Sequence, residues 1–264
     1  ILAYYREGKK VTVSEVYRKT HKFINDYIFF TSESHVKFLS VWVIGTYIFK
    51  IFRYYPYIWL NAPKQSGKTL LMEILKELSF NGDLSSNASE SAIFRDVHNN
   101  LITMFLDEVE KLSKQDMEKY GAIMTILNTG FAASGFVKRS GSQKQNFTIQ
   151  RFSTYSPKAF AGIKEIDDVV QDRTIKINML RKKPGEVAKR YKVSDALVRS
   201  QKEIRNELYI FGLQYAREIA STYNNHSDIL EVSHLENREL DIWEPIFTIA
   251  SVIDRENGNS DLTD

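Results

Sequence analysis

The chain has 264 residues, of which 43% are hydrophobic and 26% charged, and its formal net charge is +3. This length allows one large domain or two small ones, and the apolar content is ample for a buried core. Cysteine is absent, which excludes disulfides and thiolate zinc sites and favours a reducing, cytoplasmic setting. The small net charge does not by itself indicate a nucleic-acid ligand.

Residues 1–55 are predicted to form a helical segment that packs on the rest of the protein. The stretch 13–27 is amphipathic, and 32–52 is predicted to be one long helix with Ser32 or Ser34 as its N-cap.

The most apolar run, 38–49, has twelve residues between two lysines, whereas a membrane span needs about twenty. We therefore expect a buried helix there and no membrane association. No secretory signal or initiator methionine is visible, so we expect the sequence to be a segment of a longer protein.

An apolar run at 57–60 comes next and is predicted to be the first core strand. It leads into Ala-Pro-Lys-Gln-Ser-Gly-Lys-Thr at 62–69, which fits the phosphate-binding loop pattern, although the strictest form has Gly in the first position. Leucine and isoleucine then recur at helical spacing, so the motif has its strand–loop–helix context. We expect Lys68 to reach the outer phosphates of ATP and Thr69 to bind Mg²⁺. The predicted nucleotide-binding residues are Ala62, Pro63, Lys64, Gln65, Ser66, Gly67, Lys68 and Thr69.

A second acidic motif follows the run 101–106, which is apolar except for one threonine. Such a run is typical of a strand buried on both faces in a parallel sheet, and ligands bind at the carboxyl ends of these strands. We expect Asp107 to hold Mg²⁺ through water and Glu108 to polarise the attacking water. The alternative is that both acids simply begin a solvated, charged helix.

The other predicted elements complete an α/β core followed by helices. The stretch 182–185, Lys-Lys-Pro-Gly, is predicted to be a linker. This divides the chain into a helical segment at 1–55, an ATPase core at 56–182 and a helical lid at 183–264. The remaining strands are expected at 83–86, 158–163 and 174–179, and the remaining helices at 90–97, 115–127, 196–222 and 237–253.

A β-hairpin is predicted at about 134–155, around a turn at 141–146. No Asp or Glu occurs from 120 to 163, whereas this segment carries several basic residues, which is typical of a surface that contacts a phosphate backbone. The alternative is a solvated hairpin that lacks acids by chance. Its aromatic residues Phe147, Phe152 and Tyr155 are expected in the core. The predicted contacts to single-stranded DNA are Lys138, Arg139 and Lys144.

Several stretches together carry a family resemblance. They are 64–69, 106–108 (Leu-Asp-Glu), 126–130 (Ile-Leu-Asn-Thr-Gly), 152–163 (Phe-Ser-Thr-Tyr-Ser-Pro-Lys-Ala-Phe-Ala-Gly-Ile), 172–175 (Asp-Arg-Thr-Ile), 182–186 and 237–245. In this combination the chain resembles the AAA+ helicase-like ATPase domains of bacterial mobile elements and phages, from about residue 41 to 254. That group is related to replicative helicases of the minichromosome-maintenance type, including those of staphylococcal cassette elements.

The resemblance implies an AAA+ P-loop fold with sheet order 5-1-4-3-2 and a hexameric ring. It implies that Arg173 is an arginine finger for a neighbour's nucleotide, the alternative being a local ion pair. It also implies that Arg238 is a sensor of the γ-phosphate, the alternative being a pair with Glu239 or Asp241. Asn87 matches a position that restrains the catalytic Glu in some relatives. The strand ending Ala161-Gly162-Ile163 lacks the usual polar sensor, which is either Asn128 or absent.

The sequence therefore predicts Mg²⁺-dependent ATP hydrolysis that drives translocation on DNA, or its unwinding, by a ring of identical chains. One alternative is a DNA-bound initiator or switch that hydrolyses ATP without unwinding. Another is a protein-remodelling AAA+ machine, which would normally carry an aromatic pore loop instead of a basic hairpin. Stimulation by single-stranded DNA separates the first prediction from the last, and strand displacement separates helicase from switch.

Overall fold

The structure is a computed structural model. It describes residues 2–63, 65–84, 90–107, 117–140, 148–162, 167–181, 188–225, 235 and 238–263.

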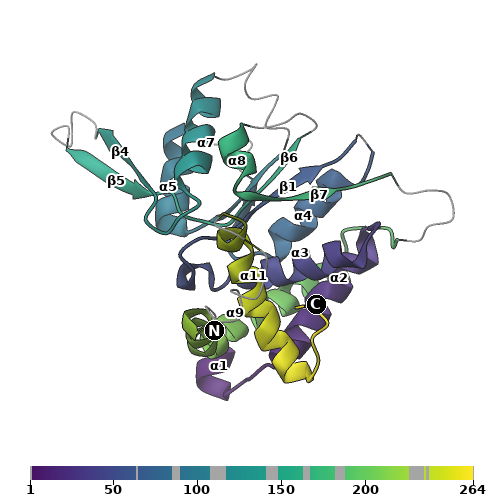
Figure 1. The fold of residues 1–264 in the computed structure, drawn as a ribbon. Coiled ribbons are helices and arrows are strands. Elements are labelled where there is room, and N and C mark those ends of the chain that lie inside the picture. The colour runs from purple at the N-terminus through teal and green to yellow at the C-terminus, as the bar shows by residue number, and fades with distance from the viewer. Residues whose placement is uncertain are drawn as a thin grey trace.

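A five-stranded parallel sheet forms the centre of the molecule (Figure 1). Its spatial order is β2-β3-β6-β1-β7. Counted in chain order without the hairpin strands, this is 2-3-4-1-5, which reads 5-1-4-3-2 from the other edge. The strands are β1 (Tyr57–Asn61), β2 (Gly82–Leu84), β3 (Thr103–Leu106), β6 (Lys158–Gly162) and β7 (Thr174–Asn178).

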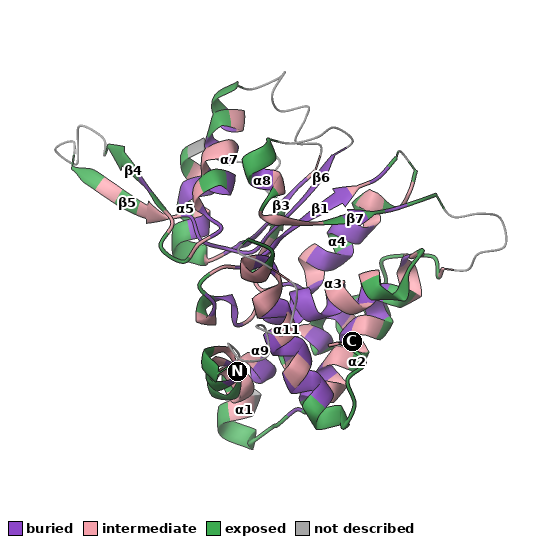
Figure 2. Cartoon of the chain, viewed as in Figure 1, coloured by how far each residue is buried: buried purple, intermediate pink, exposed green. Residues whose placement is uncertain are grey.

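Burial of the central strands explains their apolar sequences. Strands β3 and β6 are buried along their whole length, and β1 is buried except for its last residue. Alternate side chains of β1 enter two apolar clusters: Tyr57 and Trp59 face one, whereas Ile58 and Leu60 face the other. The edge strands β2 and β7 are more exposed, as strands with only one neighbour usually are. Figure 2 shows this for β7.

Helices cover both faces of the sheet. The face with Tyr57 and Trp59 packs on three helices, and the other face packs on α4 (Lys68–Leu78) and the terminal helices. The three helices on the first face are α5 (Glu90–Asn100), α7 (Met117–Thr129) and the short α8 (Asp168–Gln171). The described part of the chain is thus an α/β protein with a parallel sheet flanked by helices, as a P-loop fold requires.

The terminal helices form one layer beside the sheet. Helices from both ends of the chain share an apolar cluster with α4 and one sheet face, so the predicted lid packs directly on the predicted N-terminal segment. They are α1 (Leu2–Glu7), α2 (Val13–Tyr27), α3 (Glu33–Gly45), the 3₁₀ turn η1 (Phe49–Ile51), α9 (Asp195–Asn225) and α11 (Arg238–Asn257).

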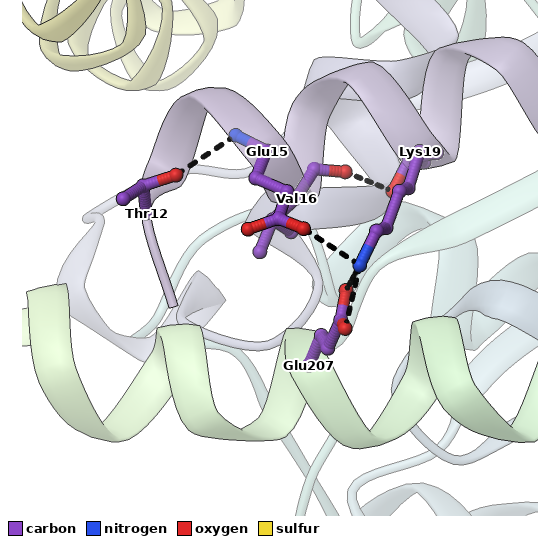
Figure 3. Close-up of polar contacts among 6 residues, drawn as sticks. Thr12, Glu15, Val16, Lys19 and Glu207 are labelled. Carbon is purple, nitrogen blue, oxygen red and sulfur yellow. Dashed lines mark hydrogen bonds and ion pairs between the residues drawn. The ribbon is translucent and has the colours of Figure 1, made fainter. Parts of the chain in front are cut away.

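Polar contacts fix this layer. The ammonium of Lys19 on α2 lies 2.7 Å from a carboxylate oxygen of Glu207 on α9 and 2.9 Å from one of Glu15 (Figure 3). Thr12 caps α2 by accepting a hydrogen bond from the backbone N–H of Glu15. Glu256 on α11 accepts a bond from the N–H of Val13, so the start of α2 is held from both sides.

The helix predicted over 32–52 is wrong in its extent. Ser32 is the N-cap as expected, but α3 ends at Gly45 and a separate 3₁₀ turn follows. The hydroxyl of Tyr55 donates to the carbonyl of Trp42, one of the last of the helix, and a Cβ at residue 45 would collide with that hydroxyl. The end of α3 therefore packs against Tyr55, a buried residue of the segment that precedes β1.

Over the described ranges, none of the helices combines the length and the apolar composition that a membrane crossing requires.

Candidate nucleotide-binding site

The loop after β1 has the backbone of an anion-binding turn. Gln65 and Gly67 both have positive φ angles, of 65° and 86°, and Gly67 is the N-cap of α4. Among the described residues no side-chain capping bond is present at Gly67, which leaves the first N–H groups of α4 free to bind an anion. A Cβ added at Gly67 would meet no atom within 4 Å, so the space above the loop is open. This geometry fits the binding of phosphate groups.

Asp107, at the end of β3, meets the first residues of α4. Its Oδ1 lies 3.1 Å from the ammonium of Lys68, and its Oδ2 accepts a hydrogen bond of 3.4 Å from the hydroxyl of Thr69. The side chains of Lys68 and Asp107 are only 13% and 22% exposed, so water screens this pair less than a surface pair. The two motifs, 38 residues apart in sequence, therefore share one site at the carboxyl edge of the sheet.

Two buried polar atoms at this site have no hydrogen-bond partner among the described residues. The hydroxyl of Ser66 is buried and has no hydrogen-bond partner among the described residues. Oδ1 of Asp107 is also buried and accepts no bond of good geometry, although it faces Lys68. Buried polar groups are almost always satisfied, and these two could accept or donate bonds to a phosphate and a cation.

Thr69 and Asp107 would hold Mg²⁺, because this ion is bound through one or two protein oxygens together with phosphates and water. Mg²⁺ would neutralise charge on the β- and γ-phosphates. Within the described ranges no group of three or more His, Asp or Glu gathers that could hold a metal alone.

Two asparagines beside the loop were not among the site residues predicted from the sequence. Nδ2 of Asn61, the last residue of β1, donates a 2.8 Å hydrogen bond to Oδ1 of Asn178, the last residue of β7. The available signal was their position: each lies within one residue of the end of a predicted strand, at 60 or at 179, and ligands bind at the carboxyl edge of open α/β sheets.

Four predicted site residues lie outside the described part of the chain. They are Lys64 of the loop, Asn87, the predicted catalytic Glu108, and Lys144 of the hairpin turn. Phe147, expected in the core, and the predicted linker at 182–185 also lie outside it.

Arg173 is engaged at the opposite end of the sheet from Lys68. It directly precedes β7, and its Nη1 donates to the carbonyls of Leu127 (3.2 Å) and Asn128 (2.6 Å), at the carboxyl end of α7. A cation there also interacts favourably with the helix dipole. The predicted sensor Asn128 lies at this same end, so the structure does not bring it near Lys68.

Arg238 also lies at the amino end of the strands. Its guanidinium pairs with Asp241 at 3.2 Å and lies over the rings of Tyr54 and Phe131, which precede β1 and follow α7. The structure therefore shows the local pair with Asp241 and does not bring Arg238 to the loop of its own chain.

The predicted hairpin is present and extends away from the sheet (Figure 1). Strand β4 (Phe136–Ser140) pairs with β5 (Ile149–Ser153), and Lys138 lies directly opposite Arg151. Because side chains alternate along a strand, Lys138 and Arg139 lie on opposite faces of the hairpin.

One face of the hairpin packs on α5. The guanidinium of Arg139 lies 4.5 Å from the ring centre of Phe94, and Phe152 packs edge-on against His98. The backbone N–H of Ser153 donates to Nδ1 of His98. Tyr155, beyond the hairpin, is buried as predicted.

The other face, which we call the outer face, carries Lys138, Arg151, Phe136 and Ile149. Ile149 is 72% exposed, and the guanidinium of Arg151 lies 3.4 Å from the ring centre of Phe136. Arg151 is thus a candidate contact that sequence analysis did not select, because its pairing with Lys138 depends on the register.

Comparisons with known proteins leave the family open. No family model and no curated protein matches the chain. Among solved structures, one described as SCCmec type IV Cch, an active helicase, is similar at 15% sequence identity with a TM-score of 0.49. The match covers 95% of this chain but 48% of that one, so the chain spans about half the length of the helicase.

Proposed function

We propose that the chain is the ATPase core of a DNA-translocating machine of the AAA+ type. The observation that carries the proposal is the meeting of Asp107 with Lys68 and Thr69 at the end of the parallel sheet. A phosphate-binding loop and a strand-end carboxylate are the two parts that NTP hydrolysis needs together.

Each residue of the site has a distinct task in this proposal. The loop N–H groups bind and orient the phosphates, and Lys68 exchanges its contact with Asp107 for phosphate oxygens. Asp107 and Thr69 would then bind Mg²⁺ through their side-chain oxygens. Glu108, the next residue in sequence, orients and polarises the attacking water.

The sheet order supports the AAA+ type within P-loop proteins, because β6 stands between the loop strand and the acidic strand. A ring of identical chains is part of the proposal. In such a ring Arg173 would serve the nucleotide of a neighbour, and its guanidinium would have to leave the carbonyls of Leu127 and Asn128 to do so.

The outer face of the hairpin supports DNA as the substrate. Two cations lie side by side there and two exposed apolar side chains flank them, which suits a phosphate backbone and its bases. A protein-remodelling machine would gain little from paired cations at this place. The alternative of a switch without unwinding remains an outcome of the test.

The test measures ATP hydrolysis with and without Mg²⁺ and single-stranded DNA, followed by strand displacement. We expect hydrolysis that requires Mg²⁺ and that DNA accelerates. Lys68→Ala is the inactive reference, and Lys76→Ala, at the other end of the same helix, is the matched control. Stimulation without strand displacement would identify the switch, and hydrolysis indifferent to DNA would contradict a DNA machine.

A further inference from the structure

Strand β6 connects the candidate nucleotide site to the hairpin. At its carboxyl end, Gly162 pairs with Asn61 of the loop strand, and β6 also pairs with β3, which ends directly before Asp107. At its amino end, only residues 154–157 separate it from β5 of the hairpin. A displacement of β6 at one end therefore has a short covalent path to the other.

The joint between β6 and the hairpin contains a completely buried lysine. Lys158 is the first residue of β6 and has no solvent exposure. Its ammonium donates to three backbone carbonyls: Ser156 at 2.8 Å, Thr154 at 2.9 Å and Gly130 at 3.2 Å. It also lies 5.0 Å from the ring centre of Tyr57.

The three carbonyls belong to separate parts of the joint. Thr154 and Ser156 lie in the connection from hairpin to β6, whereas Gly130 follows α7 and begins the connection to β4. Nearby, the hydroxyl oxygens of Thr129 and Thr154 lie 3.0 Å apart, within hydrogen-bond distance. Lys158 thus holds both connections of the hairpin to the same strand of the sheet.

Burying a lysine side chain costs free energy unless its nitrogen makes hydrogen bonds that offset the loss of water. Burial lowers its pKa well below the ordinary value, because water no longer solvates the charge. Among the described residues no carboxylate lies within ion-pair distance of it. Its nitrogen instead lies within hydrogen-bond distance of three backbone carbonyls, and an apolar side chain would remove this donor from all three.

We propose that Lys158 is a positioning residue that makes the hairpin and β6 move as one body, so that DNA on the hairpin can alter hydrolysis at the far end of β6. The inference rests on the proposed function. Separating hairpin and strand would require the loss of several hydrogen bonds in a place that water does not reach, which opposes independent movement.

The test compares Lys158→Met with wild type and with Lys176→Met, a lysine of the edge strand β7 that lies over Trp59. Hydrogen exchange is read at the amide of Thr154, bonded to the carbonyl of Gly135, and at Leu71 in α4, bonded to Gly67. We expect exchange at Thr154 to accelerate about tenfold or more in Lys158→Met, with Leu71 unchanged.

The second measurement is the rate of ATP hydrolysis with and without DNA. We expect Lys158→Met to keep basal hydrolysis and nucleotide affinity and to lose the stimulation by DNA, whereas Lys176→Met keeps all three. Unchanged exchange at Thr154 overturns the joint, whether or not the chain is an ATPase. Faster exchange with full stimulation overturns the coupling, and so does an equal fall of basal and stimulated rates.

If Lys158→Met does not fold, Gly130→Ala tests the same joint. A Cβ at residue 130 would collide with the carbonyl oxygen of Thr154 and lie 2.6 Å from the ammonium of Lys158. This variant keeps the lysine but displaces its acceptors, and the same split between basal and stimulated rates is expected. A wild-type chain that DNA does not stimulate would refute the proposed function, while the exchange measurement would still decide the joint.

Discussion

The two ends of the parallel sheet use cations in different ways. At the carboxyl end, Lys68 faces one carboxylate beside an open loop, and the hydroxyl of Ser66 has no hydrogen-bond partner among the described residues. At the amino end, Lys158 and Arg173 are bound to backbone carbonyls of their own chain. A cationic side chain with one exchangeable partner is free to bind a ligand. One that is held by several backbone carbonyls instead stabilises the fold.

Arg173 offers the largest effect that could break this comparison. In a ring, we expect Arg173→Ala to bind ATP nearly normally and to lose about 10³-fold or more in hydrolysis rate, because an arginine finger stabilises charge on the transferred phosphoryl group. Mixing this variant with Lys68→Ala should restore some activity, since one chain then supplies the loop and the other the arginine. Turnover is measured on each protein and on the mixture.

The comparison predicts a distinct result if Arg173 serves only the fold. In that case Arg173→Ala lowers the melting temperature, no mixture gains activity, and the trans role is wrong. Arg173→Lys is a useful second variant, because it keeps the charge but loses the planar donor group.

Glu108→Gln sharpens the account of the carboxyl end. The substitution keeps size and removes the negative charge, so we expect unchanged nucleotide affinity and a loss of about 10²–10⁴ in turnover. Binding and hydrolysis are measured separately, with Glu110→Gln as the control. Normal turnover in Glu108→Gln would exclude its assignment as the residue that polarises water.

Lys68→Ala tests whether the cation beside the open loop serves the ligand. We expect nucleotide affinity to fall about 100-fold, because a charged hydrogen-bond partner of the phosphates is lost. Calorimetry on Lys68→Ala and on the control Lys76→Ala gives the answer. Equal affinities in the two variants would mean that Lys68 only neutralises Asp107.

The smallest expected effect distinguishes the faces of the hairpin. Changing Lys138 and Arg151 together to Ala should weaken binding of single-stranded DNA and reduce the salt slope by about 0.7 for each lost phosphate contact. Arg139→Ala should change the slope less, because that guanidinium packs on Phe94. A salt titration of DNA affinity measures both, and a larger change in Arg139→Ala would reverse the assignment of the faces.

The proximity of the two motifs was predictable from chain order, whereas the binding roles of their residues remain predictions. The loop at 62–69 and the acid after 101–106 were predictable because each motif lies at the end of an apolar strand, and such ends meet at one edge of a parallel sheet. The hairpin followed from its alternating pattern. The end of α3 at Gly45 was not predictable, because the buried Tyr55 that accompanies it comes from another element.

The amino end of the sheet was harder to predict for a physical reason. Lys158 begins an apolar strand and would ordinarily be taken for an exposed residue, since only the distant carbonyl of Gly130 and the bend at 154–156 make its burial tolerable. Arg238 pairs with Asp241 three residues on, a contact visible in sequence, but its place over Tyr54 and Phe131 depends on tertiary packing.

The central claim is that ATP hydrolysis at the carboxyl end responds to DNA on the hairpin. The most direct measurement is the steady-state hydrolysis rate with Mg²⁺, in the presence and absence of single-stranded DNA, for wild type and for the Lys138→Ala/Arg151→Ala variant. We expect DNA to accelerate ATP hydrolysis by the wild type. The variant should keep the basal hydrolysis rate but show no acceleration. Equal acceleration of both proteins, or a wild-type rate that DNA does not change, would contradict it.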